Sequence, residues 1–183
     1  MKQLTDFSEQ FKANSRTTFS MFLFYIGIAL WIGSLVFFGF GVASVLFSSI
    51  SSRDVAGAVN RAILSRLTIV EFVGGGIILG GLLLRNQQEK GFVWKLPIVI
   101  IGIMLTLLIV YSMVIGSQMS SLVSTISSFD NPKAQDVELI AGFTSLHHLY
   151  SFLVKINLLL GFVLFVWQTL LYSMPSTKSL SES

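Results

Sequence analysis

Hydrophobic residues occupy four long runs of the chain, and short polar segments separate the runs. The first run extends from Phe19 to Phe47, and apolar residues follow one another in it without the alternation that is typical of a half-exposed strand. A transmembrane helix needs about 20 apolar residues to cross a hydrocarbon layer about 30 Å thick. Only helices and closed barrels satisfy every backbone hydrogen bond inside a bilayer. The pattern therefore predicts an all-α integral membrane protein, a bundle of four transmembrane helices.

The polar breaks between the runs set the predicted domain limits. Asp54 follows a polar turn and is expected to cap or charge the start of the second helix. Asn131 and Pro132 are typical of an N-cap and a first helical position, so we expect the last helix to begin there. Residues 1–18 are predicted to form a polar cytoplasmic segment and residues 174–183 a disordered tail. The predicted helices cover about 19–48, 54–84, 94–128 and 132–173.

The composition excludes several classes of protein and of site. Of the 183 residues, 53% are hydrophobic and 11% are charged, whereas a soluble domain usually contains about 25% charged residues. The chain has no cysteine, which excludes disulfides and thiolate metal sites. Its basic residues are dispersed, so no nucleic-acid partner is expected. The lipid bilayer is the expected environment.

The distribution of lysine and arginine predicts the orientation. The first 18 residues carry three basic side chains, and the turn between the second and third helices carries Arg85 and Lys90. The connection between the third and fourth helices carries only Lys133, whereas Arg53 and Arg61 at the start of the second helix count against this bias. Because basic residues favour the cytoplasmic side, both termini are predicted to be cytoplasmic, in the inner (plasma) membrane if the protein is bacterial.

The predicted fourth helix is longer than a bilayer requires. A helix over 132–173 would be about 63 Å long, whereas the hydrocarbon core is about 30 Å thick. The polar residues from Pro132 to Glu138 indicate that the excess lies on the outer side. We expect the third helix and the beginning of the second to extend beside it, so polar residues at this end should face one another within a bundle.

A candidate binding site lies in this extended region. Glu71 is a costly residue in a membrane helix unless it is paired, protonated or facing a polar cavity. His148 and Lys155 share one stripe of the fourth helix, so Lys155 or a protonated histidine is the expected partner of Glu71. The sequence therefore predicts an outward-facing polar site with these residues: Arg61, Arg66, Glu71, His147, His148, Tyr150, Lys155 and Asn157.

Metal and haem sites are alternative interpretations of the same region. The adjacent residues His147 and His148 point about 100° apart on a helix, so they rarely bind one ion together. Met113 and Met119 could join one histidine in a Cu(I) site. One histidine also suffices as an axial ligand of haem. No catalytic or phosphate-binding motif is present in the sequence, so we predict that the protein is not an enzyme and has no cofactor.

Glycines in the second helix are candidates for close helix packing. Gly76 and Gly80 form a G-x-x-x-G pair, which lets the backbone of another helix approach closely. We expect both to lie against a neighbouring helix, and we expect a homo-oligomer to be able to form through such glycine-rich faces.

The sequence from Ala29 to Phe38, ALWIGSLVFF, followed by Ala43 and Leu46-Phe47, resembles the opening of the transmembrane protein 205-like family, also called domain of unknown function 4149. Later residues strengthen the resemblance: Arg53, Ala56-Gly57, Arg61, Phe143, Leu146, His147 or His148, Ser151 and Asn157. The resemblance covers most of residues 20–170. It implies a four-helix membrane protein without established catalytic activity, whose eukaryotic members are associated with platinum-drug resistance. A more distant likeness joins this family to the copper resistance protein D group.

These observations predict a multi-pass membrane protein that binds or moves a small solute or metal through an outward-facing polar site. One alternative is a structural or accessory protein, in which interhelical ion pairs and hydrogen bonds only hold the bundle or a partner. Another is a haem- or copper-linked redox protein.

Overall fold

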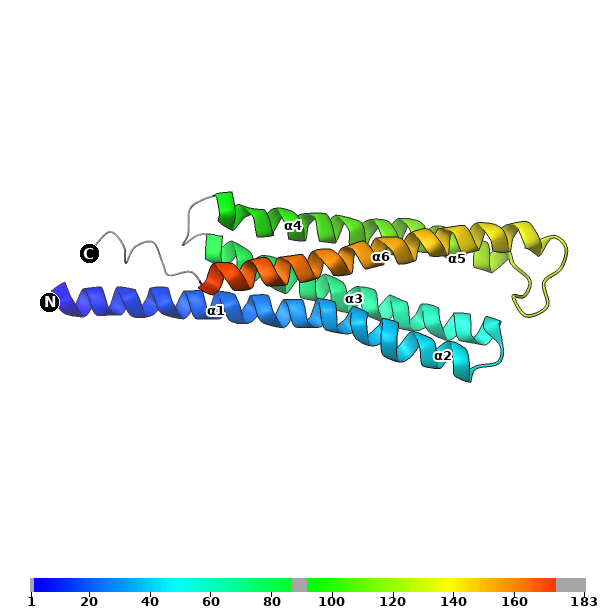
Figure 1. Cartoon of the computed structure of the whole chain (residues 1–183), viewed down its shortest axis with the longest axis horizontal. Helices are drawn as coiled ribbons and strands as arrows, with labels where there is room; N and C mark the ends of the chain where they lie inside the picture. The colour runs from blue at the N-terminus through cyan, green and yellow to red at the C-terminus, as the bar shows by residue number, and fades with distance from the viewer. Residues whose placement is uncertain (1, 87–91, 174–183) are drawn as a thin grey trace.

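The computed structural model describes residues 2–86 and 92–173, and every regular element in them is a helix (Figure 1). The two π-helical segments, η1 and η2, each join two α-helices into one continuous rod, so the described residues form four rods. The elements in chain order are α1 (Lys2–Val36), η1 (Phe37–Val42), α2 (Ala43–Ser49), α3 (Arg53–Asn86), α4 (Phe92–Ile109), η2 (Val110–Ile115), α5 (Gly116–Thr125) and α6 (Asp136–Ser173). The predicted all-α bundle is confirmed.

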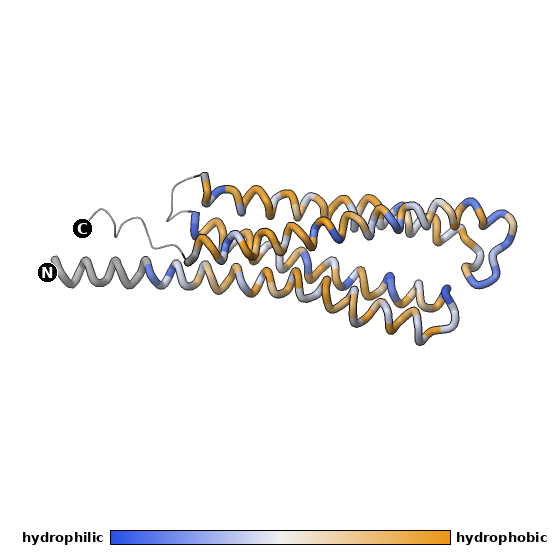
Figure 2. Tube along the Cα trace, in the orientation of Figure 1, coloured by the Kyte–Doolittle hydropathy of each residue, from blue (hydrophilic) through white to orange (hydrophobic). Residues whose placement is uncertain are grey.

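Each rod contains a segment that is long and apolar enough to cross a membrane. These segments are Asn14–Ser49, Arg53–Asn86, Val93–Thr125 and Asp136–Leu171, with lengths of 33 to 36 residues. Such lengths correspond to about 50 Å of helix, so each rod exceeds the hydrocarbon layer by about 20 Å. Hydrophobic residues continue along all four rods, whereas hydrophilic residues gather around 126–135 (Figure 2). The connections 50–52 and 126–135 lie at the same end of the bundle, which we call the loop end.

Several predicted helix limits are wrong. The first helix begins at Lys2, so the polar N-terminal segment is the first part of α1. The third rod ends at Thr125 and α6 begins at Asp136, which leaves the predicted cap Asn131 and the following proline in an irregular connection. The predicted tail, 174–183, lies outside the described residues.

The Asp136 side chain explains the late start of α6. Its carboxylate accepts hydrogen bonds from the backbone N–H of Lys133 at 2.9 Å and of Ser127 at 3.2 Å. The Ser127 hydroxyl also donates to it. Short polar side chains that bond to nearby backbone groups compete with helix formation. Asp136 therefore stabilises a folded turn over residues 127–136 in place of the expected helix.

Glycines allow the close contact between α1 and α3, because without side chains the two backbones can approach each other directly. A Cβ on Gly27 would lie 2.7 Å from the carbonyl oxygen of Gly74, and one on Gly81 would lie 2.9 Å from that of Ser20. The Ser20 hydroxyl donates to the carbonyl of Gly81 at 2.7 Å. Such close approach is typical of packed transmembrane helices.

The predicted packing role of Gly76 and Gly80 within the chain is wrong. No atom lies within 4 Å of a Cβ placed on either residue. The side of α3 that faces α1 contains Gly74, Ile78 and Gly81 instead, at helical spacing. A homo-oligomer through the open glycine face stays a prediction.

The apolar core lies in the middle of the bundle, where all four rods meet. A Cβ on Gly161 of α6 would lie 3.3 Å from Ile32 of α1 and 3.4 Å from Met104 of α4, so three rods approach closely there. The fully or almost fully buried members of this core are Phe24, Ile28, Trp31, Leu35, Ile78, Leu82, Ile101, Met104, Leu108, Tyr111, Ile115 and Leu164. Toward the loop end, α2 and α3 diverge from α5 and α6 (Figure 1).

Candidate functional site

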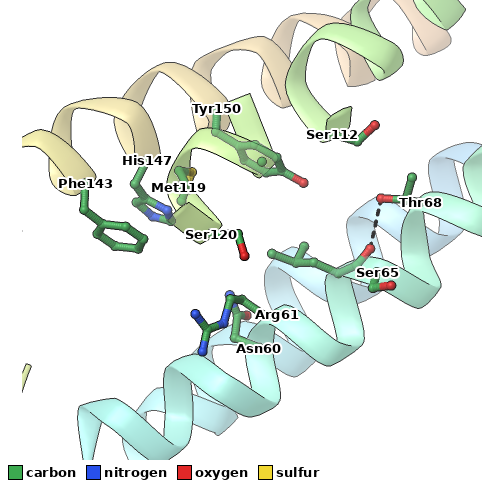
Figure 3. Close-up of a pocket in the computed structure, with 12 residues that line it drawn as sticks. Asn60, Arg61, Ser65, Thr68, Ser112, Met119, Ser120, Phe143, His147 and Tyr150 are labelled. Carbon is green, nitrogen blue, oxygen red and sulfur yellow. Dashed lines mark hydrogen bonds between the residues drawn. The ribbon is translucent and has the colours of Figure 1, made fainter. Parts of the chain in front are cut away.

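A cavity of about 320 Å³ lies where the rods diverge, between α3 on one side and η2, α5 and α6 on the other (Figure 3). We call it the first cavity. Among the described residues, Arg61 is the only lysine or arginine that lines it, and no aspartate or glutamate does. Its lining residues are Asn60, Arg61, Leu64, Ser65, Thr68, Ser112, Gly116, Met119, Ser120, Phe143, His147 and Tyr150.

Charged and aromatic groups face each other across this cavity. Arg61 extends from α3 toward the side of α6 that carries Phe143 and His147 (Figure 3). No ion pair or hydrogen bond joins its side chain to another residue in the described part of the chain. The His147 ring stacks on Phe143, with centroids 6.2 Å apart and an interplanar angle of 12°. The stacking holds the imidazole in place opposite an unpaired guanidinium.

One buried polar atom at this cavity also lacks a protein partner. The side-chain oxygen of Asn60 is buried and accepts no hydrogen bond within residues 2–86 and 92–173. The hydroxyls of Thr68 and Ser112, by contrast, donate to backbone carbonyls one turn earlier, at 3.0 and 2.5 Å. A buried polar atom without a partner is costly unless water or a ligand supplies one. The buried Asn60 oxygen therefore favours the binding of a polar ligand or water at this side of the cavity.

A buried polar cluster, which we call the floor, lies next to the cavity, toward the middle of the bundle. The Tyr111 hydroxyl donates to the Oε1 atom of Glu71 at 2.5 Å. The side-chain amide of Asn157 donates to Tyr111 Oη at 3.3 Å and to the carbonyl of Met104 at 3.2 Å. Glu71 is 2% exposed, and Tyr111 and Asn157 are fully buried. Tyr111 lies in η2, and π-helical segments often occur at functional positions.

The floor and the first cavity are in contact through two tyrosines. The rings of Tyr111 and Tyr150 meet edge to face, with centroids 5.3 Å apart. Arg61 precedes Glu71 by ten positions on α3, and His147 precedes Asn157 by ten positions on α6. Ten helical residues correspond to about 15 Å, and both helices run away from the loop end. The floor therefore lies about 15 Å further from the loop end than Arg61 and His147, on both α3 and α6.

The connection 126–135 closes the loop end by binding the start of α3. Asp54 accepts hydrogen bonds from the Ser128 hydroxyl at 2.6 Å and from the backbone N–H of Phe129 at 2.8 Å. Asp54 thus holds the opposite connection. It was predicted to cap or charge the start of its own helix, and it lies in the first turn of α3, where it supplies the charge but not the cap. We call the contact of Asp54 with the connection and the one described next the roof.

Asp130 makes the second roof contact. Its carboxylate accepts from the Ser52 hydroxyl at 2.6 Å and from the backbone N–H of Arg53 at 2.7 Å. These two hydrogen bonds hold the pKa of Asp130 below its ordinary value of 3.8. The Ser52 oxygen also accepts from the N–H of Val55 at 3.2 Å, so Ser52 is the N-cap of α3.

A second cavity of about 300 Å³ lies beside the first cavity and reaches the roof. Arg61 and Phe143 line both cavities, so the two cavities adjoin at these residues. The remaining lining of the second cavity is mostly apolar: Phe47, Arg53, Asp54, Gly57, Val123, Ile126 and Phe129. Together the two cavities form a cleft between floor and roof.

The structure brings together only part of the predicted site. Arg61, His147 and Tyr150 line the first cavity, as does the candidate metal ligand Met119. Glu71 and Asn157 form the floor. The other predicted residues line neither cavity, although they are exposed, as Arg61 and His147 also are: Arg66, His148, Lys155 and Met113.

The predicted pairing of Glu71 with Lys155 or a histidine is wrong. Glu71 accepts from Tyr111, and Lys155 is exposed. Lys155 precedes Asn157 by two positions, which corresponds to about 200° around a helix, so the two side chains point to opposite faces. Since Asn157 faces the floor, Lys155 faces away from it.

Tyr111 and Asn60 were not among the predicted site residues. The sequence did offer a sign of Tyr111, which is a hydroxyl-bearing residue within the third apolar run. Such a residue in a membrane helix needs a hydrogen-bond partner. Asn60 directly precedes Arg61 and gave no separate signal.

Comparison with known proteins assigns the chain to a family. A model of the family described as Domain of unknown function (DUF4149) matches residues 26–127, which is more than half of the chain. The protein belongs to the DUF4149 family. No curated protein matches it, and no solved structure does.

The matched range of this DUF4149 protein contains the α3 side of the cleft, the part of the other side that η2 and α5 form, and part of the floor. Arg61, Glu71 and Tyr111 lie within the match. His147 and Asn157 lie beyond it, on α6. The cleft therefore combines residues from the matched region with residues from the last helix.

Proposed function

We propose that this multi-pass membrane protein binds a small anionic solute in the first cavity and catalyses no reaction. The observation that carries the proposal is the unpaired Arg61 guanidinium in a cavity whose lining contains no carboxylate. A guanidinium presents a planar set of donors that matches carboxylate and phosphate groups. The volume of about 320 Å³ lies at the lower end of the range for small-molecule sites.

The remaining lining supports the same class of ligand. Ser65, Ser120 and His147 bring further hydrogen-bonding groups to the first cavity from three different helices. Phe143 and Tyr150 supply apolar surface that excludes water from part of the cavity. Charge-assisted hydrogen bonds are stronger where water is partly excluded. Arg61 thus supplies the charge, and its neighbours supply the orientation.

The distribution of basic residues supports an outer location of this site, because it favours cytoplasmic termini and therefore an external loop end. The floor separates the first cavity from the rest of the bundle, since Glu71, Tyr111 and Asn157 are all buried. This arrangement supports reception of a solute at one membrane face over passage through a single chain.

Titration of the purified protein with butanoate, followed by saturation-transfer NMR, tests the proposal. Arg61→Gln should weaken binding at least about tenfold, because hydrogen bonds to charged groups contribute about 1.5–3 kcal/mol. Arg66→Gln is the matched control, since Arg66 lies on the same helix, is exposed and lines neither cavity. Binding should be unchanged in that control.

Two results would contradict the proposal: no binding to the wild-type protein, or an equal loss in both variants. An absence of binding would favour the structural or accessory role, in which the cleft holds a partner helix.

Copper binding is a second candidate, and one observation favours it. Met119 and His147 line the same cavity, and a thioether and an imidazole both suit Cu(I). The distant likeness to the copper resistance protein D group supports the same chemistry, although no group of three histidine, cysteine or acidic residues suited to a metal occurs in the described chain. Competition against a Cu(I) chelator tests it, because Met119→Leu should abolish binding while Met113→Leu should not.

A further inference from the structure

The two cavities of the cleft differ in chemistry although they share Arg61. The first cavity carries unpaired polar groups, among them Asn60 and the Arg61 guanidinium. The second cavity is lined by the apolar side chains of Phe47, Val123, Ile126 and Phe129, and the charged residues Arg53 and Asp54 lie at its roof side. A ligand that fills both must therefore be charged at one end and apolar at the other.

We propose that the ligand is an amphipathic anion, with a carboxylate or phosphate head at Arg61 and an unbranched alkyl tail in the second cavity. This inference rests on the proposed function, because the head group is the anion that Arg61 binds. It adds the second cavity as a tail site and thereby names the class of solute.

The walls of the second cavity suit an alkyl tail. Phe129 from the roof and Phe143 from α6 meet edge to face, with centroids 5.2 Å apart, and form a continuous aromatic wall. A Cβ on Gly57 would have no atom within 4 Å, so the α3 side of the cavity is open. The one carboxylate in the lining, Asp54, already accepts two hydrogen bonds from the roof. It therefore needs no cation or donor from a ligand.

The position of Arg61 along α3 gives such a ligand a source. At the opposite end of α3, the Arg85 guanidinium lies 4.9 Å from the centre of the Trp94 ring, and tryptophan is enriched at membrane interfaces. Arg61 is 24 residues from Arg85, or about 36 Å along the helix. Since the hydrocarbon layer is about 30 Å thick, Arg61 reaches the head-group level of the other face. An amphipathic anion in that leaflet carries its own head group at the same level.

Dissociation constants of butanoate, hexanoate and octanoate, measured with protein in nanodiscs, test the inference. Each methylene that becomes fully buried should strengthen binding about fourfold, and the gain from butanoate to octanoate should be at least about tenfold. Gly57→Leu fills the open side of the second cavity and should reduce this gain to below about threefold, while butanoate still binds. Val123→Trp fills the same cavity from α5 and should have the same effect. Alkyl phosphates of matching length distinguish a phosphate head from a carboxylate head.

Gly33→Leu is the matched control for the cavity-filling variants. Gly33 also has no atom within 4 Å of an added Cβ, but it lies on α1 and lines neither cavity. Partition of the longer ligands into lipid is the same for every variant, so a difference between variants reports the protein site.

Each outcome of the series has a distinct consequence. If butanoate binds but affinity does not rise with chain length, the tail site is refuted and the anion site stands. The same conclusion follows if the rise persists in both filled variants. If butanoate itself does not bind to the wild-type protein, the proposed function fails and this inference fails with it.

Discussion

Replacing Tyr111 with phenylalanine isolates the energetic contribution of the floor. The substitution removes one oxygen, which donates to Glu71 at 2.5 Å and accepts from Asn157 at 3.3 Å. The phenyl ring retains the edge-to-face contact with Tyr150. Any loss of stability therefore reports the hydroxyl and its two hydrogen bonds.

The expected cost of this change is about 1–3 kcal/mol in the free energy of unfolding. Hydrogen bonds between membrane helices contribute about 0.6 kcal/mol on average and up to about 1.7 kcal/mol. The bond to Glu71 is short and fully buried, so it belongs at the upper end, whereas the longer bond from Asn157 adds less. Leaving a buried carboxyl group without its donor adds a desolvation cost.

Reversible unfolding with SDS in mixed micelles measures this free energy. Tyr150→Phe is the matched control, because no hydrogen bond of its hydroxyl is present within the described residues, and it should cost less than about 0.5 kcal/mol. In a Glu71→Leu background, Tyr111→Phe should cost about 1 kcal/mol less than in the wild type, since the partner is already absent. Equal costs of the two tyrosine substitutions, or an unchanged cost in the Glu71→Leu background, would refute the reasoning.

Three further predictions concern packing, pH and topology. Gly81→Ala should lower the melting temperature in detergent, because the new Cβ would lie 2.9 Å from a backbone oxygen. Gly80→Ala is the control and should leave it unchanged, since the new Cβ meets open space. Equal effects of the two substitutions would contradict the packing account. The pKa of Asp130 is lowered in the folded protein, so its stabilising contribution is present above about pH 4 and is lost as the pH falls through the folded value. The stability difference between the wild type and Asp130→Asn should therefore shrink in acid, and a difference that is independent of pH would refute that role. Because the chain has no cysteine, single cysteines introduced at Asn131 and Asn14 should react with an impermeant reagent from opposite sides of the membrane, the first from outside; labelling of the second from outside would reverse the orientation.

The apolar runs predicted the fold, because length and continuity alone decide whether a segment can cross a bilayer. They did not predict where helices end at the loop end. There, Asp54, Asp130 and Asp136 bind backbone groups of other segments, and those partners depend on the tertiary structure. A local N-cap pattern at Asn131 gave the wrong start of the last helix for the same reason.

Helical periodicity shows which residues share a face, but it does not show which face meets which neighbour. The G-x-x-x-G pair at Gly76 and Gly80 was recognised, yet the contact with α1 uses Gly74 and Gly81. Likewise, Glu71 was recognised as needing a partner, but a neutral hydroxyl from the third rod supplies it. The preference for a charged partner came from chemistry alone, without knowledge of how the helices are arranged.

Arg61 and His147 were predicted together because both are polar residues at the extended end of long helices. The cavity between them was not predictable, since it arises from the divergence of α3 from α5 and α6. The roof that limits it depends on hydrogen bonds between residues more than 70 positions apart.

Solid-state NMR tests the central claim, anion recognition by Arg61, most directly. The protein would be labelled with ¹⁵N-arginine in lipid and loaded with ¹³C-carboxyl butanoate, and the dipolar coupling between the two labels would be measured. A bidentate pair predicts a carboxyl carbon within about 4 Å of guanidinium nitrogens. This coupling should be absent in Arg61→Gln and present in Arg66→Gln. A coupling that survives Arg61→Gln, or no coupling in the saturated wild-type protein, would contradict the account.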